Sequence, residues 1–279
     1  MMFRILVMSV LLIVCHAALV HAAPTRTTDS DQTIVTLAPH LTEWVYSLEQ
    51  QDKLLAVSAY SDYPDAAKAL PRVADANGVN IKAIVKLQPD VILAWRGGNK
   101  PQDIARLKQL GFTVFESQPL TPADISKEYR QLGGVLHVSE RARELADNFD
   151  TQLSHLARQY KNVSAITVFY YMWTAPLMSV GPDAWASKLL AQCGVQTLFN
   201  DAHVDYPQVS VQEVIRRQPD LLIAATSRNI SVEQQFWSPH NDVLQAPVIA
   251  ANPDIFSRFT LRLIPELRSL CKQIHQTDS

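Results

Sequence analysis

One short pattern occurs twice in this chain, and it constrains the fold more than any other feature of the sequence. Residues 83–94 read AIVKLQPDVILA and residues 213–224 read EVIRRQPDLLIA, so the two copies lie 130 positions apart. Each copy has the spacing of an amphipathic helix, then Gln-Pro-Asp, then a short apolar run. Proline lacks the N–H that a continuing helix needs, and a strand that is apolar on both faces is typical of a parallel sheet covered by helices. Chance similarity is the alternative, but we interpret the pattern as two comparable halves.

Strands and helices are predicted to alternate in both halves, which indicates an α/β protein. The first half starts with a predicted strand at 33–37, and residues 38–43 open a helix for which Thr42 is a candidate N-cap. The second half starts with a predicted strand at 165–170. In such sheets ligands bind beyond the carboxyl ends of the strands. Two lobes that face one another therefore predict a ligand cleft between them.

A long helix is predicted between the halves. Thr121 and Pro122 cap and open one helix, and Ser139 opens a second helix that runs to about residue 160. Apolar residues recur along this second helix at spacings of three and four, and at 1.5 Å per residue it is about 33 Å long. We therefore expect two Rossmann-like lobes that are joined by this single long helix and move little relative to one another.

The first 22 residues have the three-part layout of a secretory signal peptide. Arg4 precedes an apolar run over 5–14, and a small-residue segment that ends at Ala22 predicts cleavage before Ala23. A run of about 10 apolar residues is too short for a membrane anchor, which needs about 20. Lipidation at Cys15 is disfavoured because Val14 stands where a small residue is required. We predict a signal peptide at 1–22 and export from the cytoplasm, then an N-terminal lobe at 23–120, a linking helical segment at 121–160 and a C-terminal lobe at 161–279.

Two cysteines, Cys193 and Cys271, remain after removal of the signal peptide. In an oxidising compartment such a pair is more often bridged than reduced, so we predict a disulfide between them. A free reactive thiol is the alternative. It is disfavoured because Cys193 stands at the apolar end of a predicted helix that Gly194 stops, and not in an electropositive pocket.

Charge and motif content exclude several classes of function. Lys and Arg together number 25 against 27 for Asp and Glu, and no block of like charge occurs, so nucleic acid is not an expected partner. The 8 glycines fit neither a dinucleotide fingerprint nor a phosphate-binding loop. No His-Glu-x-x-His, Gly-x-Ser-x-Gly or Cys-x-x-Cys motif is present. We therefore expect neither an enzyme nor a resident cofactor or metal, with a periplasmic enzyme that uses the cleft as the alternative.

Aromatic residues follow several of the predicted strands. Tyr60, Trp95, Trp173 and Tyr206 stand at strand ends or in loops, in polar and turn-like surroundings. Core packing is the alternative for any one of them, since aromatic side chains commonly fill interiors. As a set they predict an aromatic rim, which binds a large, partly apolar, disc-like ligand by contact area and leaves phenol and indole groups free for hydrogen bonds.

Three polar residues are candidates for the same cleft. Arg258 offers a fork of donors for amide or phosphate oxygens, and Asp254 offers acceptors for amides. A surface salt bridge is the alternative for this pair. His40 follows the first predicted strand, where the cleft is expected.

Three segments and the cysteine pair together resemble a known family. The segments 58–64, 94–99 and 206–210 resemble the BtuF family, the periplasmic cobalamin receptors of ATP-driven importers, within the helix-linked (class III) periplasmic binding proteins. The resemblance covers essentially the whole mature chain. It implies that cobalamin (vitamin B12) is bound between the lobes as a transported ligand and is delivered to an inner-membrane permease with its ATPase subunits. A receptor for a siderophore, haem or a metal complex, with the same architecture, is the alternative.

The resemblance also assigns roles to individual residues. It implies that Tyr60 and Trp95 contact the corrin ring, and that Asp254 and Arg258 are polar contacts. Met178 and Tyr206 stand where the family has phenylalanine and tryptophan, and Ala76 stands where it has a tryptophan. The family docks on its permease through one acidic residue per lobe, but Lys82 and Gln212 occupy those positions here, which leaves Glu213 as the docking candidate. We expect the free protein to be a monomer.

Overall fold

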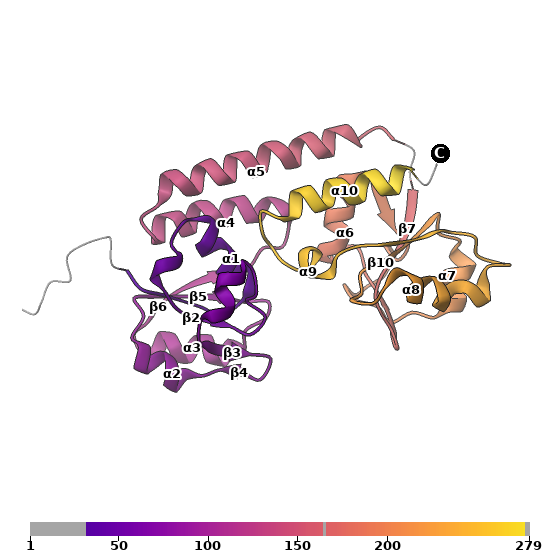
Figure 1. Cartoon of the computed structure of the whole chain (residues 1–279). Coiled ribbons are helices and arrows are strands. Elements are labelled where there is room, and N and C mark those ends of the chain that lie inside the picture. Colours follow the sequence, from indigo (N-terminus) through magenta and orange to yellow (C-terminus); the bar gives the residue numbers. More distant parts are fainter. Residues whose placement is uncertain (1–31, 164–165, 277–279) are drawn as a thin grey trace, which may run out of the picture. The chain divides into compact units, whose positions relative to one another are not determined.

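The computed structural model describes residues 32–163 and 166–276 and contains two sheets (Figure 1). The first sheet has the strand order β4-β3-β2-β1-β5-β6, and the second has the order β11-β10-β7-β8 with β9 also paired to β7. All strand pairs are parallel except β3 with β4 and β7 with β8. The strands of the first sheet are β1 (Ile34–Thr36), β2 (Leu54–Ser58), β3 (Arg72–Asp75), β4 (Gly78–Val79), β5 (Val91–Trp95) and β6 (Thr113–Ser117). Those of the second are β7 (Ile166–Thr174), β8 (Leu177–Ser179), β9 (Val195–Thr197), β10 (Leu221–Ala224) and β11 (Val248–Ala250).

Helices separate the strands along the chain in both halves. The first sheet carries α1 (Pro39–Ser47), α2 (Ile81–Leu87), α3 (Pro101–Gln109) and α4 (Pro122–Val135). The second carries α6 (Trp185–Leu190), α7 (Val211–Arg217), α8 (Ile230–Trp237), α9 (Pro253–Phe256) and α10 (Leu263–Gln276). Short 3-10 turns lie at Gln51–Lys53, Asp65–Ala69, Ala191–Cys193 and Ser238–His240. Within the described ranges, no helix is both long enough and apolar enough to cross a bilayer.

Strands such as β5 and β10 are apolar on both faces because each sheet separates two cores. In β5, Val91 and Leu93 belong to a core that also contains α1 and α4 residues, while Ile92 and Ala94 belong to a second core with α2 and α3. The second sheet divides its strands in the same way. Successive side chains of a strand point to opposite faces, so a continuous apolar run is required here. The predicted α/β class with two sheet-and-helix lobes is confirmed. We call the first sheet with its helices the first lobe and the second sheet with its helices the second lobe.

The repeated pattern has the same structure in both halves. Gln88 and Gln218 end α2 and α7 in the left-handed conformation, with φ of 49° in each case. Asp90 accepts a hydrogen bond from the backbone N–H of Thr33 at 2.8 Å, and Asp220 accepts one from the N–H of Thr167 at 2.7 Å. Each Gln-Pro-Asp thus ends a helix, starts a strand and braces the first strand of its sheet. The two copies therefore have the same structural role in their sheets.

The long linking helix is confirmed. It is α5 (Ser139–Gln159), which packs along α4 and reaches α10 (Figure 1). Thr121 caps α4 as predicted, in a capping box with Asp124. The prediction for Thr42 was wrong: α1 begins at Pro39, and Thr42 lies buried inside the helix, where its hydroxyl bonds those of Thr36 at 2.7 Å and Ser61 at 2.9 Å.

The predicted disulfide is confirmed. Cys193 and Cys271 are joined across a sequence separation of 78 residues, with their Cα atoms 5.0 Å apart, and both are fully buried. The bond ties the 3-10 turn after α6 to α10. Gly194 follows this turn with φ of 69°, as expected for a residue that ends a helix. The predicted signal peptide lies outside the described residues.

Substitution by alanine is expected to have opposite effects on stability at two adjacent glycines near the end of α4. A Cβ on Gly133 would lie 2.2 Å from the Cβ of Ala142 on α5, whereas a Cβ on Gly134 would meet nothing within 4 Å. We expect Gly133→Ala to lower the free energy of unfolding by about 1 to 3 kcal/mol through overpacking. The matched Gly134→Ala variant should raise it by about 0.5 to 1 kcal/mol, because alanine favours a helix. Urea unfolding curves measure both values, and equal effects of the two substitutions would contradict the close approach of α4 and α5.

Candidate functional site

A cavity of about 640 Å³ lies at the carboxyl ends of three strands. Trp95 ends β5, Trp173 and Thr174 end β7, and Ala225 follows β10 directly. The remaining wall comes from β7, the turn after β10, α6, α9 and the segment after α9, together with Tyr206. Seven of the lining residues are aromatic, namely Trp95, Tyr170, Trp173, Trp185, Tyr206, Phe256 and Phe259. Its position agrees with the general rule for ligand sites in α/β sheets.

Trp95 is the lining residue that the first sheet supplies. Its indole ring lies against the turn that follows β5, where a Cβ on Gly98 would be 2.1 Å from the ring and one on Gly97 would be 2.7 Å from it. Any larger residue at 97 or 98 would displace the indole. The two glycines after Trp95 therefore allow this ring to reach the cavity.

Phe259 organises the rings around it. Its centroid lies 5.6 Å from that of Trp95, 4.6 Å from that of Trp185 and 5.1 Å from that of His40, with edge-to-face geometry in each case. Its carbonyl accepts a hydrogen bond of 2.6 Å from the indole N–H of Trp44 on α1. Hydrogen bonds and ring contacts thus hold this segment of the aromatic wall from both lobes.

A cluster of four charged residues lies beside this wall. Arg258 donates to Glu43 at 3.1 Å and to Asp62 at 2.8 Å, and Arg262 donates to both oxygens of Glu43 at 2.5 and 2.8 Å. Glu43 and Arg258 are buried. Burial alone would raise the pKa of Asp62, but the hydrogen bond and charge of Arg258 outweigh it and hold that pKa below its usual value. The cluster joins α1 to the segment between α9 and α10.

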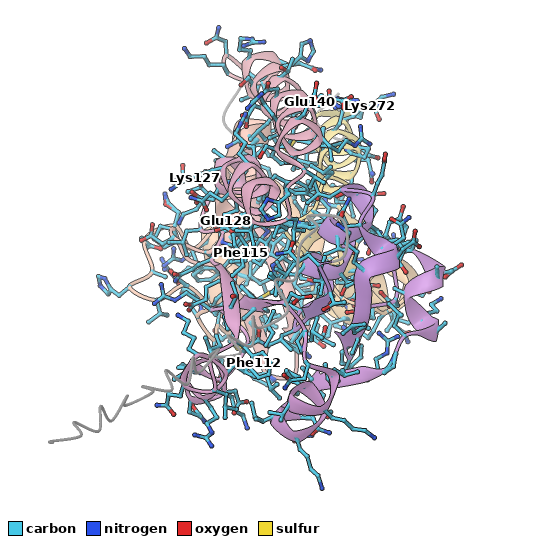
Figure 2. The ribbon with its side chains drawn as sticks, turned by 90° about the vertical axis from the view of Figure 1, so that its left-hand side faces the viewer. Phe112, Phe115, Lys127, Glu128, Glu140 and Lys272 are labelled. Atoms are coloured by element: carbon cyan, nitrogen blue, oxygen red, sulfur yellow. A yellow bond between two sulfur atoms is a disulfide. The ribbon has the colours of Figure 1, made fainter. Side chains whose placement is uncertain are left out.

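His40 lies in the interior next to this cluster. Burial, and to a lesser extent the charge of Arg258, lowers the pKa of its imidazole to about 3, so the ring is neutral. Its Nε2 lies 3.4 Å from the Ser117 hydroxyl, which donates to Glu128 at 2.6 Å. Burial raises the pKa of this glutamate. Figure 2 labels Glu128 on α4 and Phe115 on the neighbouring strand β6.

A second buried carboxylate holds part of the opposite wall. Glu233 on α8 accepts hydrogen bonds from Tyr171 at 2.9 Å, from Thr226 at 2.5 Å and from Arg228 at 2.7 and 2.9 Å. Thr226 and Arg228 line the cavity. Burial alone would raise the pKa of Glu233, but these hydrogen bonds outweigh it, so the pKa lies below its usual value and the carboxylate is ionised.

The predicted ligand-binding residues divide into two groups. Trp95 and Tyr206 line the cavity, as does Trp173, which ends a strand and does not lie in a loop. The others are not among the lining residues: Tyr60 and Asp254 are exposed, Met178 is half-buried on β8, and His40 and Arg258 are buried.

The predicted docking residue is already paired. Glu213 lies on α7 and accepts hydrogen bonds from Arg216 at 2.6 and 2.9 Å and from Arg217 at 2.7 Å. These bonds lower the pKa of the Glu213 carboxyl to about 2.

Sequence reasoning missed most of the second-lobe wall. Trp185, Phe256, Phe259 and Arg228 were not predicted as site residues. The repeat contains a signal for Arg228. Because residues 83–94 correspond to 213–224, the turn at 95–98 corresponds to the turn at 225–228. The first turn contributes Trp95 to the cavity, and all four residues of the second line it.

Two α/β lobes joined by one long helix, with an aromatic cavity at their strand ends, define a ligand-binding protein of the two-lobed class. A sequence profile described as "Periplasmic binding protein" matches residues 34–246, and the chain belongs to this family.

Named relatives share most of the sequence. A "Vitamin B12-binding protein" of Pectobacterium atrosepticum is 36% identical over 280 residues, which cover 98% of this chain and 96% of that protein. The crystal structure of the periplasmic vitamin B12 binding protein BtuF of Vibrio cholerae superposes with a TM-score of 0.80 at 34% identity, over 89% of this chain and 98% of that one. The periplasmic heme-binding protein RhuT of Roseiflexus sp. RS-1 has a TM-score of 0.78 over 89% of this chain and 100% of that one, but at 17% identity it shares the fold alone.

Proposed function

We propose that this chain is a periplasmic receptor that binds cobalamin in the aromatic cavity and delivers it to an ATP-driven importer of the inner membrane. The observation that carries the proposal is 36% identity to a vitamin B12-binding protein over nearly the whole length of both chains. As receptor, the protein makes and breaks no covalent bonds. The membrane permease with its ATPase subunits is its proposed partner, and the free receptor is proposed to be a monomer.

The cavity suits a corrin ring on physical grounds. A corrin is a broad and partly apolar disc with amides around its edge. Aromatic side chains bury large areas against such a disc, and the indole N–H of Trp95 and the phenol of Tyr206 add hydrogen-bonding groups. Contacts within the protein hold these rings, which limits the binding free energy that is spent on ordering them.

The residues outside the cavity wall stay proposed contacts. Tyr60 and Asp254 are exposed and free to meet a ligand that extends beyond the cavity. Met178, His40 and Arg258 need a rearrangement first, and Arg258 would have to exchange a carboxylate for a ligand oxygen. We retain Glu213 as the proposed docking residue, on condition that a permease arginine competes with Arg216 and Arg217.

The binding test uses the mature protein, which we propose to begin at Ala23. The lobe boundaries stay proposed at 23–120 and 161–279, with the linker at 121–160, and the binding test does not depend on them because it uses the whole mature chain. Isothermal titration with cyanocobalamin should give one site per chain, and the visible spectrum of the vitamin should change. Haemin under the same conditions serves as the comparison ligand. Absence of heat and of a spectral change at micromolar concentrations, or tighter binding of haemin, would refute the proposal.

Trp95→Ala tests the aromatic contact itself. We expect this variant to bind cyanocobalamin more weakly by about 1 to 3 kcal/mol, because it loses buried apolar area and a ring contact. Phe112→Ala removes a partly buried ring from the first lobe outside the cavity and is the matched control. Titration calorimetry on both variants, with thermal melting to verify folding, measures the difference. An unchanged dissociation constant for Trp95→Ala would remove Trp95 from the site.

A further inference from the structure

Arg228 is distinctive among the described residues that line the cavity. No Lys, His, Asp or Glu occurs in this set, so Arg228 is its one charged member. The rest of the wall is aromatic, small, or neutral and polar. A single cation in such surroundings is a strong source of orientation for a ligand, because the apolar walls offer few competing hydrogen bonds.

The guanidinium of Arg228 is fixed by the buried carboxylate of Glu233. Its Nε and Nη2 donate to the two oxygens of Glu233 at 2.7 and 2.9 Å, and the Glu233 side chain is 1% exposed while that of Arg228 is 41% exposed. Tyr171 and Thr226 occupy further lone pairs of the same carboxylate. The fork geometry of arginine leaves Nη1, with two N–H groups, outside this arrangement. A fixed donor therefore lies at the cavity edge.

The pair also determines what kind of interaction is available. Arg228 and Glu233 together carry no net charge, so long-range attraction of an anion is weak. A directional hydrogen bond from a fixed guanidinium to an anionic oxygen remains strong at short range. A ligand group with an anionic oxygen at hydrogen-bonding distance from Arg228 therefore suits this site better than a ligand with a diffuse negative charge.

We infer that Arg228 binds an anionic oxygen of the ligand and that Glu233 is its positioning residue. The inference rests on the proposed function, and in cobalamin it assigns the contact to the phosphodiester of the nucleotide loop. This group is the only anionic oxo group of the vitamin. The corrin amides contact the remaining wall, so Arg228 distinguishes complete corrinoids from those that lack the loop.

The test compares two corrinoids on the full mature chain. Cyanocobalamin carries the phosphodiester, whereas dicyanocobinamide has the corrin ring and its amides without the phosphate, ribose and base. Arg228→Gln alone would leave Glu233 buried without its main partner, so the principal variant is Arg228→Gln with Glu233→Gln. We expect its dissociation constant for cyanocobalamin to rise about tenfold, the value of one charge-assisted hydrogen bond. Its dissociation constant for dicyanocobinamide should stay within about twofold of the wild-type value.

Two further variants complete the test. Arg216→Gln removes another arginine that is bidentate to a glutamate in the second lobe but lies outside the cavity, and it should change neither affinity. Glu233→Gln alone should weaken cyanocobalamin binding less than the double variant and leave dicyanocobinamide binding unchanged, which a purely structural effect would not do.

The outcomes separate this inference from the proposed function. A wild-type protein that binds neither corrinoid refutes the proposed function, and the inference falls with it. If the wild type binds both corrinoids, the double variant tests Arg228 by itself. A double variant that weakens the binding of both corrinoids equally, or of neither, refutes the role of Arg228 but not the proposed function. Selective loss of cyanocobalamin binding establishes it.

Discussion

Replacement of both Cys193 and Cys271 by alanine should lower the free energy of unfolding by up to about 4 to 5 kcal/mol, the largest effect that we expect from any change in this chain. The bond closes a loop of 78 residues, and cross-linking a loop of this length removes much of the conformational entropy of the unfolded chain. Alanine avoids placing unpaired hydroxyls at two fully buried positions. Urea unfolding of the oxidised wild type and of the variant measures the difference.

Reduction provides the control for the disulfide. Wild-type protein unfolded in the presence of a reductant should have the midpoint of the double variant, and the reductant should leave the variant unchanged. The bond lies between the turn after α6 and α10 and does not line the cavity. Cyanocobalamin affinity at low temperature should therefore be retained. A variant as stable as the oxidised wild type would show that the bond adds no stability.

Acid should destabilise the protein through His40. The imidazole has a pKa of about 3 in the folded protein and about 6.5 in the unfolded chain. Between these values the unfolded state binds one proton more than the folded state, so the free energy of unfolding falls as the pH falls. The slope is up to about 1.4 kcal/mol per pH unit, and the total loss between pH 6.5 and pH 3 is about 4 kcal/mol.

A substitution separates His40 from the other titrating groups. Arg258 keeps its charge throughout, while Asp62 and Glu128 titrate in the wild type and in His40→Gln alike. The difference in unfolding free energy between the two proteins should thus be constant above about pH 6.5 and shrink steadily below it. Curves for His40→Gln and the wild type that run parallel below pH 6.5 would mean that the imidazole is not held neutral.

Local patterns in the sequence predicted much of the fold. The Gln-Pro-Asp repeats, the Thr121 cap and the stripe along 139–160 each depend on neighbours within a few residues, and each corresponds to an element of the structure. Thr42 did not behave as predicted, because Pro39 starts the helix earlier. The hydroxyl then finds partners on β1 and in the loop after β2, which no local pattern specifies.

The site was harder to predict because its wall comes from distant segments. Trp95 and Tyr206 could be identified, since each stands in turn-like surroundings. Phe259 could not, because its role depends on contact with α1, and Trp44 lies 215 positions away in the chain. Arg258 shows the same limit: it is a plausible ligand contact by residue type, yet it also pairs with Glu43 across 215 positions.

The two aspartates that brace the sheets have a consequence for how this protein adapts. Asp90 and Asp220 fix the starts of their strands, far along each strand from the turns that reach the cavity. Those turns read WRGG at 95–98 and ATSR at 225–228, although the strands before them are alike. Structural support and cavity lining are thus encoded at opposite ends of one module. Substitutions in the turns can therefore change the cavity wall without removing the hydrogen bonds that brace the strands.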